Sequence, residues 1–285
     1  MRLGLLIQGP LVSTGKTGQT ANLPTSALTD RDFRTFDCTS TITEWTKSLL
    51  AQEFLVSTWQ GEPTSVVKRV SAVLGRENIL LNVDPFRDHN TSIYSKERVA
   101  INGKRQLLST LLGVRALIHR GCTHVIKVRT DQLIKADVLL ADFFSAINLH
   151  DQCLFTPYFD PRKPWRLSDF FFGADSRILK NQLEFTLSMP SLDPDIHIDL
   201  FLRWSQRFLS RRRPATVRQL RTWRLSYMKS AWDHFAVAQR ETYDGIVWRG
   251  APLQGPTRFR FADELHRGRQ PGVRDFIRVP QLGSR

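Results

Sequence analysis

The chain has 285 residues, of which 41% are hydrophobic and 24% are charged, a composition that excludes a largely disordered protein. Its formal net charge of +14 predicts attraction to an acidic partner: nucleic acid, an anionic membrane surface or a phosphorylated substrate. Cys38, Cys122 and Cys153 follow no metal-ligand spacing, which argues against a zinc site or a disulfide framework. The apolar run before Gly9 is too short for a secretory signal, and no apolar stretch approaches the roughly 20 residues of a membrane span. We therefore expect a cytoplasmic protein whose membrane contact, if any, is peripheral.

Three apolar segments, separated by two segments with helical spacing, open the chain. We expect strands at residues 3–8, 53–59 and 78–85, and helices at residues 41–52 and 63–75. This order predicts a βαβαβ unit, and hence an α/β protein.

The same alternation continues to about residue 180. A stripe of apolar residues predicts a helix over 102–120, and a second helix is expected over 136–147. Residues 153–159 read as a strand, and residues 167–179 as a strand that turns into a helix. A mostly parallel sheet flanked by helices is the simplest fold that accounts for this order.

Beyond residue 195 the pattern becomes helical and strongly basic. Eight arginines fall between residues 203 and 224, among aromatic neighbours. Such a segment is either a solvated helical face or a face that docks on an anionic membrane. We therefore divide the chain into a core, residues 1–195, and a basic helical region continuous with it, residues 196–285.

The segment "THVIKVRTD", residues 123–131, places charges at every second position. Because strand side chains alternate between the two faces of a sheet, Lys127, Arg129 and Asp131 are expected to share one face. Charges near the carboxyl end of a central strand indicate the crevice where α/β sheets bind ligands. Together with Arg105, Lys127 and Arg129 would supply the positive charge that a phosphate ester needs. The Asp131 carboxylate beside them would suit a divalent cation that bridges the phosphate oxygens. An Arg129–Asp131 ion pair that only stabilises the strand end is the alternative.

Six short motifs, "LLIQGP", "STWQG", "NVDP", "NGKRQLLSTLLGVRAL", "KVRTD" and "SDFFFG", occur between residues 3 and 210. The order and approximate spacing of these motifs resemble those of the WavE family of lipopolysaccharide synthesis proteins. The resemblance implies a GT-A-like fold with a Rossmann-type, mostly parallel sheet. It also implies a glycosyltransferase that uses a nucleotide-sugar donor and a saccharide or lipid-linked saccharide acceptor. The product would be lipopolysaccharide core or another surface polysaccharide.

The resemblance also implies a donor site. Asn102 and Arg105 resemble the arginine-containing helix that precedes the Asp-x-Asp metal motif of GT-A enzymes, so Arg105 would meet the nucleotide or its diphosphate. Asp131 stands where the last acid of that motif would be, whereas Arg129 replaces the first. Either Mg²⁺ or Mn²⁺ binds at Asp131, or Arg129 neutralises the leaving diphosphate as a guanidinium clamp. For Gln8 and Asp84, ordinary hydrogen bonding within a loop is the alternative. The expected donor-binding residues are Gln8, Gly9, Asp84, Asn102, Arg105, Lys127, Arg129 and Asp131.

Transfer with inversion needs a carboxylate base on the acceptor hydroxyl. Asp169 in "LSDFFFG" and Asp199 in "HIDLFLRW" are the two catalytic candidates, and Asp195 competes for the role of Asp199. A strand-edge cap is the alternative for Asp169, and a helix N-terminal acid is the alternative for Asp199. His197, without an identifiable partner in the sequence, is expected to be structural or solvent-facing.

Two other functions stay open from the sequence. The charge and the arginine-rich segment favour a nucleic-acid-binding protein, although no recognised nucleic-acid motif appears and that function leaves "KVRTD" and "SDFFFG" unexplained. A degenerate member of the fold could also bind a nucleotide sugar without transferring it, because a fold does not fix a function.

Overall fold

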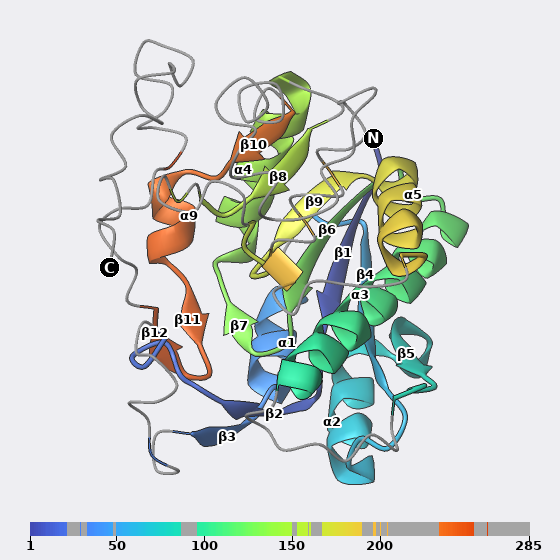
Figure 1. The fold of residues 1–285 in the computed structure, drawn as a ribbon, viewed down its shortest axis with the longest axis vertical. Helices are drawn as coiled ribbons and strands as arrows, with labels where there is room; N and C mark the ends of the chain where they lie inside the picture. Colours follow the sequence, from blue (N-terminus) through green and yellow to red (C-terminus); the bar gives the residue numbers. More distant parts are fainter. Residues whose placement is uncertain are drawn as a thin grey trace, which may run out of the picture.

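The computed structural model describes residues 1–21, 29, 33–47, 50–86, 96–149, 153–158, 160, 167–189, 196–197, 200, 204, 234–253 and 261. Within these ranges a central sheet contains seven strands, which are β1 (Leu3–Gln8), β4 (Glu53–Trp59), β5 (Ile79–Asn82), β6 (His124–Arg129), β8 (Leu154–Thr156), β9 (Phe172–Asp175) and β10 (Phe235–Val237). They are hydrogen-bonded in the order β10-β8-β9-β6-β1-β4-β5 (Figure 1).

The sheet is mostly parallel, as predicted. β1 runs parallel to β4 and β6, β4 runs parallel to β5, and β8 runs parallel to β10. β9 is the exception, since it pairs antiparallel with both β6 and β8.

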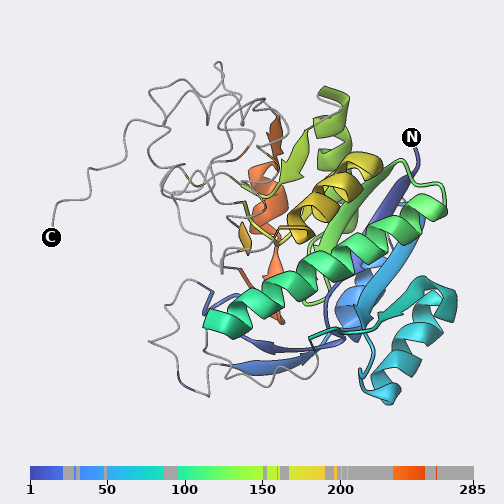
Figure 2. The same cartoon turned by 45° about the vertical axis from the view of Figure 1, so that its right-hand side comes forward.

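Helices cover both faces of the sheet. They are α1 (Thr39–Trp45), α2 (Thr64–Leu74), α3 (Lys96–His119), α4 (Ala136–Leu149) and α5 (Ser176–Leu187). α3 and α5 lie together on one face (Figures 1 and 2), where Leu6, Leu111 and Leu183 belong to one hydrophobic cluster. A second cluster, which includes Ile7 and Phe143, joins the opposite face to α1, α2 and α4. The mostly parallel sheet flanked by helices that the alternating elements predict is therefore confirmed.

Two smaller sheets and two short helices complete the described fold. β2 (Val12–Gly15) pairs antiparallel with β3 (Arg34–Asp37), and β11 (Val247–Trp248) pairs antiparallel with both β7 (Gln132–Leu133) and β12 (Ala251–Pro252). The short helices are η3 (Arg76–Asn78) and α9 (Arg240–Asp244).

Residues 234–253 differ from the helical region that the sequence predicts there. β10 forms an edge of the central sheet, and β11 pairs with β7, directly after β6. Strands of two or three residues are too short to show a periodic pattern. This C-terminal segment is therefore part of the core.

The chain order creates a switch point between β1 and β6. From β1 the chain proceeds to β4 and β5 on one side, and then returns to place β6 on the other side of β1. Open α/β sheets bind ligands outside the carboxyl ends of their strands at such a point. Here Gln8 of β1 lies in register with Arg129 of β6, so the predicted site residues stand at this crevice.

Gly9 closes the turn after β1 at this switch point. Its φ of 141° is disfavoured for other residues, and an added Cβ would lie 2.6 Å from Oγ1 of Thr130. We expect Gly9→Ala to lower the free energy of unfolding by about 2–3 kcal/mol through strain and this contact. Gly61→Ala is the matched control, because Gly61 has a φ of 96° with nothing within 4 Å of an added Cβ, so only strain of about 1–2 kcal/mol applies. Urea unfolding measures both, and equal losses would contradict a steric role for Thr130.

Candidate functional site

Arg129 joins two buried carboxylates at the carboxyl end of β6. Its Nε donates to Oδ1 of Asp131 at 2.9 Å and its Nη2 donates to Oδ2 at 3.1 Å. Its Nη1 donates to Oδ2 of Asp169 at 2.9 Å. On the same face of β6, Nζ of Lys127 donates to the backbone oxygen of Asp169 at 2.6 Å. The structure thus brings together four of the residues that the sequence singled out.

Asp131 is enclosed by hydrogen-bond donors. Its Oδ2 accepts from Oγ of Ser13 at 2.9 Å and from Nε1 of Trp248 at 3.2 Å, and it lies 2.9 Å from Nη2 of Arg249. Its side chain is 1% exposed. Burial by itself raises the pKa of Asp131, but Arg129 and Arg249 outweigh burial and hold this pKa well below its usual range. Asp131 is therefore an ionised carboxylate between two guanidinium groups.

This arrangement does not fit a divalent cation at Asp131. Mg²⁺ and Mn²⁺ take several oxygen ligands, often from more than one carboxylate, whereas the groups around Asp131 are two arginines, an indole N–H and a hydroxyl donor. Nowhere in the described part of the chain do three His, Cys, Asp or Glu side chains group as metal ligands would. The described groups around Asp131 therefore form an ion-pair network and not a set of metal ligands.

Both carboxylate oxygens of Asp169 also have polar partners. Nε2 of Gln106, on α3, donates to Oδ2 at 2.9 Å, and Nε2 of His197 lies 3.0 Å from Oδ1. Burial raises the pKa of Asp169, but His197 and Arg129 reverse that effect and hold the pKa well below its usual range. Asp169 therefore stays ionised at neutral pH. The sequence left His197 as structural or solvent-facing, and it did not indicate this contact with the candidate catalytic carboxylate.

Lys127 is fully buried in the middle of β6. Its Nζ lies 5.2 Å from the centre of the Phe172 ring, and burial lowers its pKa from 10.5 to about 7. A strand lysine with this contact to the Asp169 backbone supports the loop that carries the carboxylate.

Lys127→Met tests this burial through the pH dependence of stability. Between pH 7 and pH 10.5 the unfolded chain keeps a proton on Lys127 that the folded chain has lost. The free energy of unfolding of the wild type therefore increases relative to that of the variant as pH rises, by about 1.4 kcal/mol per pH unit for one proton. Urea unfolding at pH 7, 8 and 9 gives the difference, with exposed Lys68→Met as the control. Parallel pH curves for wild type and Lys127→Met would contradict the prediction.

A row of buried polar side chains crosses the sheet beside Gln8. Nε2 of Gln8 donates to Oγ of Ser109 on α3 at 2.8 Å. Oγ of Ser57 donates to the Ser109 backbone oxygen at 2.7 Å, and Nδ2 of Asn82 donates to Oγ of Ser57 at 2.9 Å. These contacts fix the carboxyl ends of β1, β4 and β5 against α3. In this structure the Gln8 side chain makes a structural hydrogen bond.

Asp84 and Arg105 pair at the end of β5. Nη2 of Arg105 lies 2.9 Å from Oδ2 of Asp84 and also donates to the Phe86 backbone oxygen at 2.8 Å. Asn102 lies one turn earlier on α3, with its Oδ1 3.5 Å from Nη1 of Arg105. The structure therefore groups these three residues separately from the contacts of Arg129, although both groups lie at the same edge of the sheet.

The family model for WavE lipopolysaccharide synthesis matches residues 4–154, which is more than half of the 285 residues. The chain belongs to the WavE family. This match includes the first strand, the pair of Asp84 and Arg105, and β6 with Arg129 and Asp131. The resemblance predicted from the short motifs is thus confirmed.

Other comparisons add only a general likeness for this WavE-family chain. No curated protein matches it. It is similar to the solved structure of mannose-1-phosphate geranyltransferase from Thermus thermophilus, with 12% identity and a TM-score of 0.35 over 69% of this chain and 67% of that one. It is also similar to 4-diphosphocytidyl-2C-methyl-D-erythritolsynthase from Anaerococcus prevotii, with 12% identity and a TM-score of 0.42 over 74% of this chain and 84% of that one. Likeness at this level assigns no activity.

Three residues that contact Asp131 in this WavE-family chain were not predicted from its sequence: Ser13, Trp248 and Arg249. The last two lie on the hairpin of β11 and β12, whose two-residue loop is Arg249-Gly250, with φ values of 47° and 76°. Two successive positive φ values are typical of a type I′ turn. The segment "VWRGAP" carries the glycine of such a turn, which is the one signal that could have indicated this hairpin.

Some predictions fall outside the described residues. Asp199, Asp195 and all eight arginines of residues 203–224 lie there. Trp204 is described, and it is 1% exposed within the hydrophobic cluster beneath α3 and α5. This side chain, one of the aromatic neighbours of those arginines, is therefore in the core.

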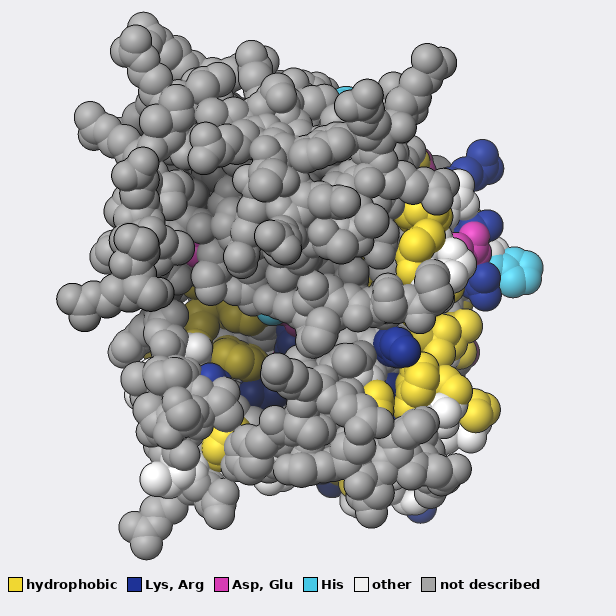
Figure 3. All heavy atoms as spheres, viewed as in Figure 1, with side chains coloured by type: hydrophobic (Ala, Val, Ile, Leu, Met, Phe, Trp, Pro, Cys, Tyr) yellow, Lys and Arg dark blue, Asp and Glu magenta, His cyan; other side chains and the backbone are white. Residues whose placement is uncertain are grey.

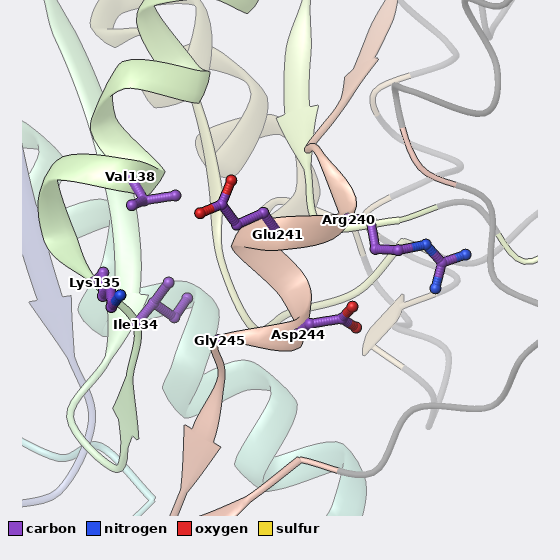
Figure 4. A pocket seen from close by; sticks show the side chains of 7 residues that line it. All are labelled: Ile134, Lys135, Val138, Arg240, Glu241, Asp244 and Gly245. Atoms are coloured by element: carbon purple, nitrogen blue, oxygen red, sulfur yellow. The ribbon is translucent and has the colours of Figure 1, made fainter.

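A separate hollow of about 470 Å³ lies between the start of α4 and α9. Figure 4 shows its lining residues, which are Ile134, Lys135, Val138, Arg240, Glu241, Asp244 and Gly245. Arg240 and Asp244 extend to one side of α9, whereas Glu241 extends towards Val138 (Figure 4). None of the predicted site residues lines this hollow, and its charges do not converge on one point.

Proposed function

We propose that this WavE-family chain is a glycosyltransferase with a GT-A-like donor site. It would transfer a sugar from a nucleotide-sugar donor to a saccharide or lipid-linked saccharide, in the synthesis of lipopolysaccharide core or another surface polysaccharide. Membership of a lipopolysaccharide synthesis family supports the class of product. The observation that carries the proposal is Arg129 held between Asp131 and Asp169 at the switch point of the sheet. A guanidinium group fixed in a crevice of this kind suits a phosphate group.

The donor would lie across the carboxyl ends of the strands. Its diphosphate would face Arg129, with Lys127 beneath, and its nucleoside would lie towards β5, near Asp84 and Arg105. Gly9 would allow close approach of the donor at the end of β1, because it has no side chain. Gln8 and Asn102 would border the nucleoside side of the crevice.

The chemical step would take place beside Asp169. An oxygen of the acceptor attacks the anomeric carbon, the bond from that carbon to the phosphate oxygen breaks, and the electron pair leaves with the nucleoside diphosphate. The acceptor proton passes to a carboxylate base. Asp169 is ionised before this step, so it can accept that proton, as a base that its lowered pKa weakens, or stabilise the developing positive charge of the sugar. Asp199 is the second candidate for the same role.

A panel of nucleotide sugars tests the proposal. The purified chain is incubated with UDP-, GDP-, CMP- and ADP-sugars and lipopolysaccharide core fragments, and release of the nucleotide is measured. We expect release from one donor that depends on the acceptor. Nucleotide binding without release from any donor would favour a degenerate member of the family that binds but does not transfer.

A nucleic-acid-binding function is supported by a different observation. The chain carries a net charge of +14, and the described side chains on the face in Figure 3 are chiefly hydrophobic and basic. Counterion release would then make binding strongly salt-dependent. A gel shift with duplex and single-stranded DNA and RNA, together with failure of the nucleotide panel, would favour this function over transfer.

We also propose a cellular location for the enzyme. No helix in the described part of the chain is both long and apolar enough to span a bilayer. We place the enzyme in the cytoplasm, peripherally on the inner face of the cytoplasmic membrane, where the basic region beyond residue 195 would meet anionic lipids. Sedimentation with anionic liposomes that weakens as salt is raised supports this placement, and absence of sedimentation at low salt contradicts it.

A further inference from the structure

The charge balance around Asp131 points to how the site neutralises a diphosphate. Arg129 and Arg249 carry two positive charges that face the carboxylates of Asp131 and Asp169. A divalent cation bound there would add two positive charges, and no carboxylate in the described part of this cluster would be left to balance them. An anionic diphosphate would add no positive charge, and Arg129 still has N–H donors that the two carboxylates do not use.

Arg129 is placed to bind that anion directly. A guanidinium group has five N–H donors, and the contacts to Asp131 and Asp169 use three of them. Its side chain is 21% exposed, whereas those of Asp131 and Asp169 are 1% and 8% exposed. The two carboxylates therefore hold the guanidinium plane from the buried side and leave its two other N–H groups for a ligand. A cation oriented in advance needs little reorganisation when charge develops on the leaving group.

Arg249 holds Asp131 from the opposite side. Its Nε donates to Oγ of Ser13 at 3.0 Å, its Nη1 donates to the Lys16 backbone oxygen, and its backbone N–H donates to the Asp131 backbone oxygen at 2.9 Å. Its side chain is 8% exposed, and its ring contact is with Trp248, at 4.8 Å from the guanidinium carbon. Arg249 thus fixes Asp131 without itself reaching the crevice.

The backbone around Arg249 is tightly constrained. Its φ of 47° is unusual for a residue other than glycine. A Cβ at Gly15 would lie 2.8 Å from its Nη1, and a Cβ at Gly18 would lie 2.2 Å from the Ala251 backbone oxygen. The hairpin of β11 and β12 therefore closes against the segment after β1. Strained backbone of this kind persists where the surrounding contacts over-determine it, and it clusters at functional sites.

We propose that the donor diphosphate is bound by Arg129 without a divalent cation, and that Asp131 and Arg249 are positioning residues that hold Arg129 in place. This inference rests on the proposed function. It assigns the C-terminal hairpin to the donor site, and it assigns Asp131 to orientation of the arginine instead of to metal binding.

Nucleotide binding to the full chain tests the inference. The protein is treated with EDTA, and calorimetric titration with UDP, GDP, CMP and ADP is carried out in EDTA, in Mg²⁺ and in Mn²⁺. We expect one of the three nucleoside diphosphates to bind with a Kd that differs by less than about 3-fold among the three conditions, whereas CMP, a monophosphate, is expected to bind more weakly. Arg129→Met should weaken that binding by about 10- to 100-fold, which is the range for a hydrogen bond to a charged group.

Variants of Arg249 separate positioning from a purely structural role. We expect Arg249→Met to weaken nucleotide binding by about 10-fold, and Arg249→Lys to recover part of the affinity because the charge is kept. Arg115→Met is the matched control, since Arg115 pairs with Glu184 on the surface, away from the site. Thermal melting of each variant shows whether it is folded at the temperature of the titration.

The outcomes distinguish this inference from the proposed function. Binding that disappears in EDTA and returns with Mn²⁺ in the wild type would overturn the inference and leave the glycosyltransferase proposal standing. Absence of binding to every nucleotide, with and without metal, would remove the proposed function and the inference together. Binding in EDTA that Arg129→Met leaves unchanged would move the diphosphate away from Arg129 and also overturn the inference.

Discussion

Asp131→Asn is expected to lower the free energy of unfolding by about 3–5 kcal/mol, the usual cost of removing one partner from a buried ion pair. The Asp131 carboxylate is 1% exposed and contacts Arg129 and Arg249. An amide has the same shape but no charge, so both guanidinium groups would lose a counter-charge within a buried site. The amide also presents N–H donors to groups that are themselves donors, namely Trp248 and the two arginines.

Urea unfolding followed by tryptophan fluorescence at pH 7 measures this loss. Glu184→Gln is the matched control, because Glu184 pairs with Arg115 at side-chain exposures of 35% and 52%, and we expect it to change stability by less than about 1 kcal/mol. Since the folded pKa of Asp131 is lowered, its contribution is present above the unfolded pKa of about 4. It is lost as pH falls further, so the two unfolding free energies should converge in acid. A loss as small as that of the control would show that Asp131 is not the anion of this cluster.

The strands that form the site were predictable because their patterns are long and regular. Ile126 and Val128 alternate with Lys127 and Arg129, and the structure places the two apolar residues in the hydrophobic cluster with Ile7. The two cations lie on the other face and contact Asp169. Two-residue alternation was enough to predict that these charges share a face, and the order of elements was enough to place that face at the edge of the sheet.

Partners distant in sequence were not predictable. The direction of β9 was missed because a strand of four residues, Phe172–Asp175, has the same pattern whether it runs parallel or antiparallel. Arg249 was missed because its role depends on a hairpin of two-residue strands, and because arginine is unusual at a position with positive φ. His197 was missed because only the fold brings it to Asp169. Local patterns predict elements, whereas these contacts depend on tertiary structure.

Asp169→Asn is expected to reduce kcat for sugar transfer by about 10²- to 10⁴-fold, the range for loss of a general base. The Kd of the nucleotide should change by less than about 3-fold, because Arg129 keeps its two hydrogen bonds to Asp131. The carboxylate lies beside Arg129 but is not one of the groups proposed to contact the diphosphate. Gln106 and Arg129 contact Oδ2 and His197 contacts Oδ1, so an asparagine oxygen could keep only part of these hydrogen bonds. Loss of the negative charge removes the proton acceptor and the stabilisation of the sugar cation together.

Separate measurement of kcat and of nucleotide affinity decides whether Asp169 acts on the reacting sugar or only supports Arg129. Loss of support for Arg129 would weaken nucleotide binding about as much as it lowers turnover, whereas a base affects turnover alone. The exposed Asp244→Asn variant is the matched control, and Asp199→Asn is compared under the same conditions. Because transfer needs one carboxylate base, a large loss in Asp199→Asn beside an unchanged Asp169→Asn would assign the proton transfer to Asp199. Unchanged turnover in both variants would contradict the assignment of the base to Asp169 or Asp199 and would leave Asp195, the third predicted carboxylate, as the next variant to measure.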